Sequence, residues 1–165
     1  MVGGSLLQLP TDIFETGDKK GTIIDSGTTL TYLPEAAYKA VWDKVFHSHS
    51  DLSFQTVQEF SCFQYTGKTC RNLDSSKSVI NNPFSIDEGF PEVIFKFEDS
   101  LTLHVYPHDY LFENEKDYCF GFQNGGLQSK EGRDMFLLGD LVLSNKLVVY
   151  DLENQVIGWT DYNYH

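Results

Sequence analysis

The amino-acid sequence predicts a mainly β fold with one or two short helices. Phenylalanine, tyrosine and tryptophan make up 15% of its 165 residues, and aromatic residues are enriched in strands. Several short segments alternate apolar and polar residues between turn-forming residues, as half-buried strands do. Residues 34–48 instead repeat their apolar side chains at helical spacing. A chain of this length is expected to form one domain with a sizeable core.

The first part of the chain is predicted to hold strands and turns. Residues 5–7 and 22–25 carry strand signals, with a corner at residues 10–12 and a polar turn at residues 15–20. The opening Val-Gly-Gly-Ser-Leu-Leu is typical of a strand that enters a domain already under way. We therefore expect the start of this chain to lie inside a longer protein.

One amphipathic helix is predicted from Pro34 to about Ser48. Proline suits the first helical position, because its missing N–H would have no partner there. The apolar side chains recur at four-residue steps, with aromatic residues broadening the stripe, which predicts one face docked on a sheet. The residues of this face are Ala37, Tyr38, Val41, Trp42 and Val45.

The remainder of the chain continues the β pattern after one unpatterned segment. Residues 66–88 are polar and rich in serine and asparagine, which predicts a long surface loop or a disordered insertion. Residues 93–97 and 101–105 alternate as two strands joined by a turn at residues 98–100. Residues 107–112 and 118–122 are predicted to extend the all-β character.

The C-terminal stretch predicts a buried strand and a hairpin. Residues 135–140 form an apolar run that closes on Gly139, and residues 141–145 are expected to form one or two helical turns. Residues 147–152 and 155–159 flank Glu153-Asn154, which is a compact hairpin signal.

Charge and composition exclude several classes of function. The net charge is −12 at pH 7, so nucleic acid and anionic membranes are poor partners. The acidic balance fits an acidic compartment. The sequence has no apolar run of membrane-spanning length and no signal peptide. No metal or organic cofactor is implied, and His47, His49 and His108 are expected to be surface residues rather than catalytic groups.

Three cysteines, Cys62, Cys70 and Cys119, leave an odd one whatever the pairing. Their spacing does not suggest a zinc site. The preferred bridge joins Cys62 to Cys119, and closing that long loop is worth roughly 4 kcal/mol in the chain-entropy model. Three reduced, partly buried thiols are the alternative, because the redox compartment is not visible in the sequence.

The most informative segment is Thr-Ile-Ile-Asp-Ser-Gly-Thr-Thr at residues 22–29. A β-branched strand ends on Asp25, and the apolar residues before it are expected to remove this carboxylate from water. Gly27 allows a sharp turn that exposes backbone amides. A carboxylate in such a setting is a candidate catalytic acid or base. The alternative is a plain turn, since Asp-Ser-Gly is a common tripeptide.

Two separated parts of the sequence resemble one family in the right order. Ile-Ile-Asp-Ser-Gly-Thr at residues 23–28 is similar to the catalytic loop of pepsin-like aspartic proteases. Phe-Leu-Leu-Gly-Asp at 136–140, Val-Val-Tyr-Asp at 148–151 and Val-Ile-Gly-Trp at 156–159 resemble the end of their C-terminal lobe. Further segments, at 89–97, 105–111 and 138–147, are similar to the plant, nepenthesin-like group. The resemblance covers essentially the whole chain and implies one lobe, over residues 1–165, of the bilobal pepsin-like fold, with an atypical insertion at about 66–88.

The resemblance implies a role for each matching residue. Asp25 corresponds to the second catalytic aspartate of a bilobal enzyme, and Ser26 to the hydroxyl that braces the two active-site loops. Gly27 and Thr28 correspond to positions that donate hydrogen bonds to the carboxylate. The closing motif, in which glycine permits close approach of two backbones, is structural and comprises Leu138 and Gly139. The resemblance also supports the Cys62–Cys119 bridge, leaves Cys70 free and implies a secreted, endomembrane or vacuolar protein.

The implied activity is water-mediated hydrolysis of peptide bonds, which needs two carboxylates. One ionised carboxylate activates the water, and its protonated partner donates to the scissile carbonyl oxygen. Only Asp25 is followed by Ser/Thr-Gly in this sequence. The second carboxylate must therefore come from an N-terminal lobe or from a second copy in a homodimer. The alternatives are a non-catalytic protein-binding lobe, similar to plant xylanase inhibitors, and an inactive truncated product.

Overall fold

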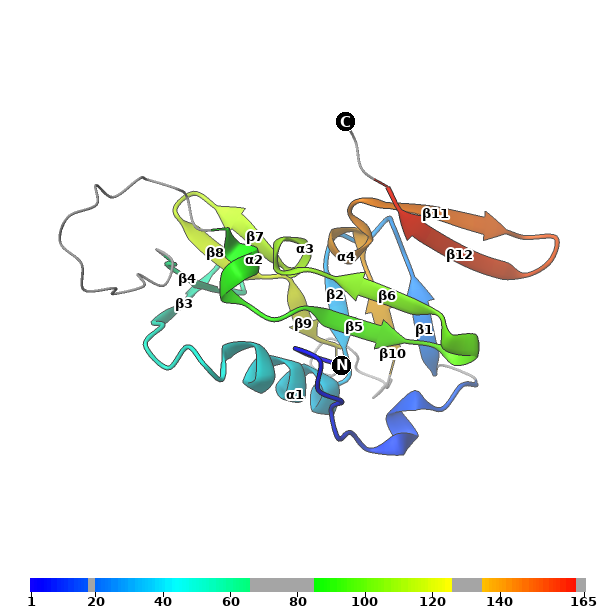
Figure 1. Ribbon diagram of the computed structural model, residues 1–165, viewed down its shortest axis with the longest axis horizontal. Coiled ribbons are helices and arrows are strands. Elements are labelled where there is room, and N and C mark those ends of the chain that lie inside the picture. The colour runs from blue at the N-terminus through cyan, green and yellow to red at the C-terminus, as the bar shows by residue number, and fades with distance from the viewer. Residues whose placement is uncertain (18–19, 66–84, 126–134, 163–165) are drawn as a thin grey trace, which may run out of the picture. The chain divides into compact units, whose positions relative to one another are not determined.

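A computed structural model of the protein describes residues 1–17, 20–65, 85–125 and 135–162 (Figure 1). The chain divides into two compact units. Unit 1 comprises Met1–Gln8 and Lys39–Gly121, and unit 2 comprises Leu9–Tyr38 and Phe122–His165. The fold is mainly β, as predicted from the sequence. That residues 1–165 form a single lobe stays a prediction.

Unit 2 is built on a mixed four-stranded sheet whose strands come from both of its segments. The strands β1 (Gly21–Ile24), β10 (Met135–Leu138), β2 (Thr31–Leu33) and β9 (Phe122–Asn124) neighbour one another in that order. β1 pairs with β10 in parallel, β10 with β2 antiparallel, and β2 with β9 in parallel. This order brings the predicted strand at 22–25 directly beside the predicted buried strand at 135–140.

Two short helical segments complete the sheet region of unit 2. The 3₁₀ helix η1 (Thr11–Phe14) follows Pro10, and its Ile13 side chain is buried. The single turn α4 (Asp140–Leu143) follows Gly139 and buries Val142 and Leu143. This turn confirms the helical prediction for residues 141–145 to within one residue at its start.

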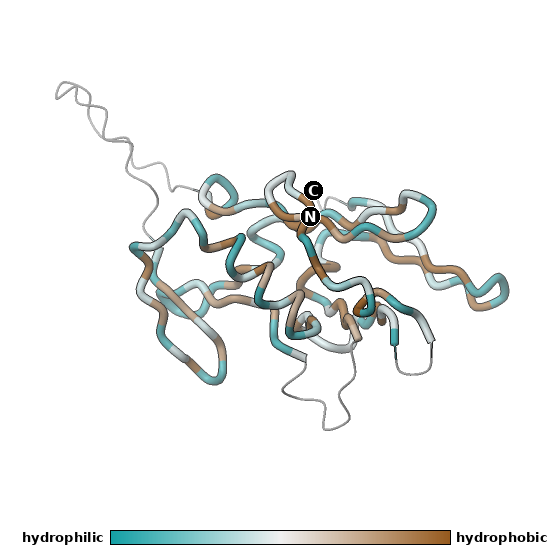
Figure 2. Tube along the Cα trace, turned by 90° about the horizontal axis from the view of Figure 1, so that it is seen from below, coloured by the Kyte–Doolittle hydropathy of each residue, from teal (hydrophilic) through white to brown (hydrophobic). Residues whose placement is uncertain are grey.

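A separate two-stranded sheet forms the end of unit 2. The strands β11 (Lys146–Asp151) and β12 (Val156–Asp161) pair antiparallel in full register, as the hairpin signal predicts. The turn is closed by Asp151, whose carboxylate accepts the backbone N–H of Asn154 at 3.0 Å and its side-chain amide at 2.7 Å. Figure 2 shows hydrophobic arms and a hydrophilic tip in this hairpin.

Unit 1 contains an antiparallel sheet that carries the disulfide. Its strands neighbour one another in the order β3 (Phe54–Val57), β4 (Phe60–Phe63), β8 (Asp117–Phe120) and β7 (Leu111–Asn114). Cys62 and Cys119 face each other across β4 and β8 and form a disulfide, so the predicted bridge is confirmed. Cys70 lies outside the described residues.

The long helix α1 (Glu35–Phe46) runs from unit 2 into unit 1 and matches the predicted helix. Pro34 lies one position before its first residue, where its carbonyl accepts the N–H of Tyr38 at 2.8 Å. The predicted apolar face is correct in that Ala37, Val41 and Val45 are buried. Within unit 1, Phe46 packs edge-on against Phe63 of β4 and Phe120 of β8, so this part of α1 is docked on the sheet.

A hairpin and two helical turns are further elements in the described part of unit 1. The strands β5 (Val93–Lys96) and β6 (Thr102–Val105) pair antiparallel around η2 (Glu98–Ser100), as predicted. The single turns α2 (Ile86–Gly89) and α3 (Pro107–Tyr110) were not predicted. The described residues thus hold one α-helix longer than a turn and three single-turn α-helices, besides the 3₁₀ helices η1 and η2.

Three sequence-based predictions of local structure were wrong. Residues 5–7 do not form a strand, because Gly3 and Gly4 adopt positive φ and turn the chain back so that Val2 bridges Ser5. Residues 107–110 form the helical turn α3 rather than a strand, with the Asp109 carboxylate accepting the N–H of Tyr106 at 3.0 Å. The unpatterned segment ends before Ser85, whose side chain caps α2. Its residues 66–84 lie outside the described parts of the chain.

Candidate active-site loop

The Asp25 loop begins where β1 ends and is anchored at once to the neighbouring strand. The backbone N–H of Asp25 donates to the carbonyl of Leu138, the last residue of β10, at 2.9 Å. This bond continues the parallel β1–β10 ladder by one residue, so Asp25 leaves the sheet from a fixed position. The pairing of β1 with β10 therefore fixes the backbone position from which the Asp25 side chain extends.

Two donors from the loop itself hold the carboxylate. The N–H of Gly27 donates to Oδ1 at 2.9 Å, and the Thr28 hydroxyl donates to Oδ2 at 2.7 Å. The Thr28 hydroxyl, followed by the Gly27 amide, lowers the pKa of Asp25 below its ordinary value, because both bonds favour the charged form. In this chain the loop favours an ionised Asp25. The Ser26 side chain, by contrast, is exposed.

The expected removal of Asp25 from water is wrong. Asp25 is only half-buried, and Ile23 of the preceding strand is 42% exposed. The apolar residues before the carboxylate do not cover it within the described residues, so hydrogen bonds rather than burial determine its protonation. A carboxylate of this kind stays ionised above its lowered pKa, and a second carboxylate beside it would be needed for the two groups to share a proton.

Backbone hydrogen bonds from the segment at 138–141 hold the far side of the loop. The N–H of Asp140 donates to the Thr28 carbonyl at 2.7 Å, and that of Leu141 to the Thr29 carbonyl at 3.1 Å. Gly139 lies between these contacts, and a Cβ there would clash with the carbonyl oxygens of Leu30 and Thr28. The two backbones approach so closely that only glycine fits at this position.

Thr31 is a residue of the site that the sequence reasoning missed. Its side chain is fully buried in β2, and its hydroxyl accepts the N–H of Gly139 at 3.2 Å. Its signal in the sequence was a hydroxyl in the same alternating position as the buried Leu33. The Asp25 loop, Leu138, Gly139 and Thr31 all belong to unit 2.

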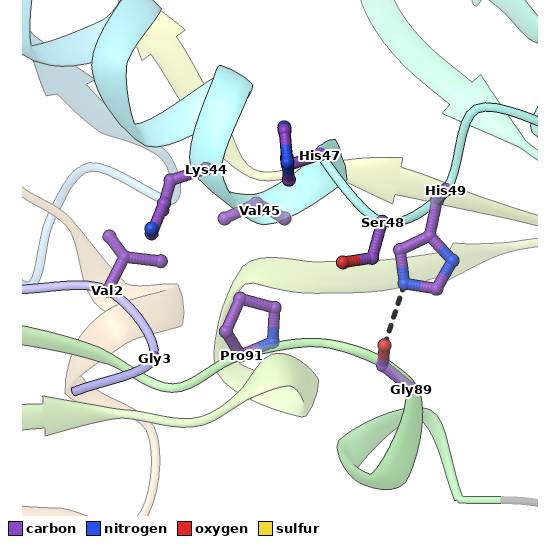
Figure 3. A pocket seen from close by; sticks show the side chains of 9 residues that line it. All are labelled: Val2, Gly3, Lys44, Val45, His47, Ser48, His49, Gly89 and Pro91. Atoms are coloured by element: carbon purple, nitrogen blue, oxygen red, sulfur yellow. Dashed lines mark hydrogen bonds between the residues drawn. The ribbon is translucent and has the colours of Figure 1, made fainter. Parts of the chain in front are cut away.

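The three histidines expected at the surface, His47, His49 and His108, belong to unit 1, whereas the Asp25 loop belongs to unit 2. His49 was expected at the surface but is buried: its Nε2 lies 2.7 Å from the Gly89 carbonyl, and its ring stacks on Phe90. Figure 3 shows it at one side of a hollow of about 310 Å³ in unit 1. His47 and His108 are exposed, and the Nδ1 of His108 lies 2.8 Å from the Asp87 carboxylate.

The described residues were expected to hold no metal site and no membrane-spanning segment. Among them, no group of three or more His, Cys, Asp or Glu side chains is arranged to hold a metal ion. Nor is any helix within the described ranges long and apolar enough to cross a membrane.

Comparison with known proteins defines the class. Residues 1–161 match the family described as "Xylanase inhibitor C-terminal". The chain therefore belongs to this family. It is 49% identical to Aspartic proteinase 36 and 46% identical to Aspartic proteinase 39, both of Arabidopsis thaliana, over 98% of its length. It is 29% identical to Aspartic proteinase nepenthesin-2 of Nepenthes gracilis over 96% of its length. These relatives confirm the resemblance to the C-terminal lobe of plant pepsin-like proteases.

Solved structures confirm the fold. The protein described as edgp superposes with a TM-score of 0.66 at 18% identity, covering 98% of this chain and 37% of that one. Basic 7S globulin from soybean gives a TM-score of 0.61 at 20% identity, covering 88% of this chain and 35% of that one. The chain spans only 30% of the length of the two Arabidopsis proteinases.

Proposed function

We propose that this chain supplies one of the two catalytic carboxylates, Asp25, of an aspartic endopeptidase. The observation that carries the proposal is the loop geometry: both oxygens of Asp25 accept a hydrogen bond, at 2.9 and 2.7 Å, while the carboxylate stays accessible to solvent. An ionised carboxylate held in this way is prepared to take a proton from a water molecule that attacks a peptide carbonyl.

A second carboxylate must complete the site. When two carboxylates lie within hydrogen-bonding distance they share a proton, because both cannot ionise at low cost. The ionised member then acts as general base and the protonated member donates to the carbonyl oxygen of the substrate. The lowered pKa of Asp25 favours the ionised role for this chain's carboxylate. Ser26, Gly27 and Thr28 are proposed to support the loop, and Leu138 and Gly139 to close it.

Exposed apolar side chains on the C-terminal hairpin support the proposal that this chain packs against a partner. One face of it carries Leu147, Val149 and Val156, which are 51%, 56% and 59% exposed; we call these three residues the hairpin face. Gly158, opposite Val149, leaves open space at the centre of this face. An isolated two-stranded hairpin is marginally stable in water, so it gains most from a covering partner. The relatives, of which this chain spans 30%, have ample further sequence for such a partner.

The proposed partner is an N-terminal lobe rather than a second copy. Each copy carries a net charge of −12 at pH 7, so two copies repel each other unless many carboxylates are protonated. A homodimer that pairs two Asp25 loops is therefore confined to acidic solution. The disulfide in unit 1 fits a protein of an oxidising compartment, either secreted or of the endomembrane system and vacuole.

A chimera tests the proposal. The matching segment of Aspartic proteinase 36 is replaced by this chain, and cleavage of a denatured protein substrate is measured near pH ~4, where a shared-proton pair is singly ionised. We expect cleavage by the chimera and a loss of at least about a thousandfold with Asp25→Asn. Asp12→Asn, an exposed carboxylate of unit 2, is the matched control and should leave the rate unchanged. An Asp25→Asn chimera as active as its parent would refute the proposal.

A non-catalytic protein-binding lobe is the second candidate. It is favoured by the name of the matching family, which describes inhibitors. The complete Asp-Ser-Gly-Thr loop, with both of its donors on the carboxylate, favours the protease instead. A partner lobe that also carries Asp-Thr/Ser-Gly indicates a protease, and one without it indicates a binding protein.

A further inference from the structure

We infer that the buried Thr31 hydroxyl is a positioning group for the Asp25 loop, because it fixes the peptide that holds both ends of that loop. The hydroxyl accepts the N–H of Gly139 at 3.2 Å across a sequence separation of 108 residues. This inference rests on the proposed role of Asp25 and adds a residue that the catalytic motif does not contain.

Thr31 occupies a position that packing alone would give to an apolar residue. In β2, Thr31 and Leu33 point to one side and are both fully buried, while Tyr32 between them is half-buried. Valine has almost the same shape as threonine and an equally high preference for strands. A buried hydroxyl is costly unless it is hydrogen-bonded, so its presence here indicates that the Gly139 N–H needs an acceptor at this position.

The group that Thr31 holds lies between two anchors of the loop. Leu138 accepts the N–H of Asp25 at 2.9 Å, and Asp140 donates to the carbonyl of Thr28 at 2.7 Å. Gly139 joins these two residues and has no side chain of its own to fix its orientation. The Thr31 hydroxyl therefore sets the orientation of the Gly139 N–H. This N–H lies between the hydrogen bond that fixes Asp25 and the one that fixes Thr28.

The effect is expected to reach the carboxylate through Thr28. The Thr28 hydroxyl contacts Asp25 Oδ2 at 2.7 Å and is the main cause of the lowered pKa of Asp25. If the segment at 138–140 loses its orientation, the carbonyl of Thr28 moves with it and the hydroxyl no longer points steadily at the carboxylate. Asp25 then becomes easier to protonate and less well placed for a partner carboxylate.

The test uses nuclear magnetic resonance on the full chain, without any assay of cleavage. Thr31→Val removes the hydroxyl and keeps the shape, while Thr31→Ser keeps the hydroxyl. Thr22→Val makes the same change at an exposed position of β1 in the same sheet and is the control. We expect Thr31→Val to speed hydrogen exchange at the Gly139 amide by about tenfold or more and to raise the pKa of Asp25. Thr31→Ser and Thr22→Val should leave both quantities close to those of the unchanged chain.

Two results would overturn the inference. One is an Asp25 titration that is the same in folded Thr31→Val and in the unchanged chain, which would make Thr31 a packing residue only. The other is a Gly139 amide that exchanges at the unprotected rate in the unchanged chain, a result that counts even if Thr31→Val does not fold. Failure of the proposed protease function would appear separately, as an active Asp25→Asn chimera, since neither readout here depends on catalysis.

Discussion

Unit 1 and unit 2 treat their hydrophobic residues differently. In unit 1 an aromatic cluster fills the space beside a disulfide-linked sheet, with Phe46, Phe63, Phe90 and Phe120 all buried. In unit 2, apolar side chains of the terminal hairpin remain exposed. Among the described residues, eight of the twelve exposed large hydrophobic side chains belong to unit 2: Phe14, Ile23, Leu147, Val149, Tyr150, Leu152, Val156 and Tyr162.

The difference indicates where function lies. Unit 1 buries its aromatic cluster among residues of the same unit, and this burial stabilises the fold. Unit 2 combines an accessible, hydrogen-bonded carboxylate with apolar strands that lack cover from the described residues, which is typical of a part that meets another chain or segment.

The largest effect is expected for the disulfide of unit 1. Replacing both Cys62 and Cys119 by serine should lower the free energy of unfolding by about 4 kcal/mol, because the bridge closes a loop of 57 residues. Denaturant unfolding without reductant measures the loss. Cys70→Ser is the control, and the prediction that Cys70 is free requires a change below about 0.5 kcal/mol. Equal losses from both replacements would contradict the pairing as the source of stability.

The next effect concerns the close approach of two backbones at Gly139 in unit 2. Gly139→Ala should lower the free energy of unfolding by about 3 kcal/mol, because the new Cβ meets the carbonyl oxygens of Leu30 and Thr28. Gly158→Ala, in β12, meets nothing within 4 Å and should be close to neutral. The same urea midpoint for Gly139→Ala and Gly158→Ala would show that the close packing at Gly139 does not hold the Asp25 loop.

The hairpin face should affect association more than stability. Val149→Thr with Val156→Thr should leave the free energy of unfolding within about 0.5 kcal/mol, because both side chains are already exposed. In acidic solution, where the repulsion between two copies is reduced, light scattering should show less self-association of the double variant than of the unchanged chain. By contrast, Val142→Thr buries a hydroxyl in α4 and should cost about 1–3 kcal/mol. Undiminished self-association of the double variant would mean that another surface is responsible.

The smallest effect is the pH dependence of unit 2. The folded-state pKa of Asp25 lies below its unfolded value, so its contribution to stability is present above the unfolded pKa of about 3.9 and is lost as pH falls through the folded pKa. Asp25→Asn and Thr28→Val should each make the fall in stability below pH ~4 shallower. Thr22→Val should leave this fall in stability unchanged. If Thr28→Val also left it unchanged, the hydrogen bond from Thr28 to Asp25 would not be its cause.

The sequence predicted most of the fold because its signals were local. Helix α1 and the terminal hairpin follow from periodicity and from Glu153-Asn154. The turn α2 also has a local signal, because Ser85-Ile-Asp-Glu88 has the spacing of a helix start, although this signal was not used to predict a helix. The turn α3 was not readable in the same way, because residues 107–110 match a strand pattern and Pro107 permits either structure.

The missed features of the site depend on contacts between distant segments. The exposure of Asp25 is decided by what covers Ile23, and a strand pattern does not say which face is covered. The role of Thr31 depends on Gly139, more than a hundred residues later. His49 was expected at the surface because a histidine after a helix is usually polar surface, yet Gly89 and Phe90 enclose it.

If this chain holds half of a two-carboxylate site, the isolated chain should cleave peptides only when two copies associate. Peptide cleavage is measured near pH ~4 over a range of protein concentrations. The range extends down to concentrations at which light scattering shows only monomer. We expect no cleavage by the monomer, and any activity at higher concentration must rise faster than linearly and vanish with Asp25→Asn. Cleavage by the monomer that rises linearly with concentration and requires Asp25 would show that one carboxylate is sufficient.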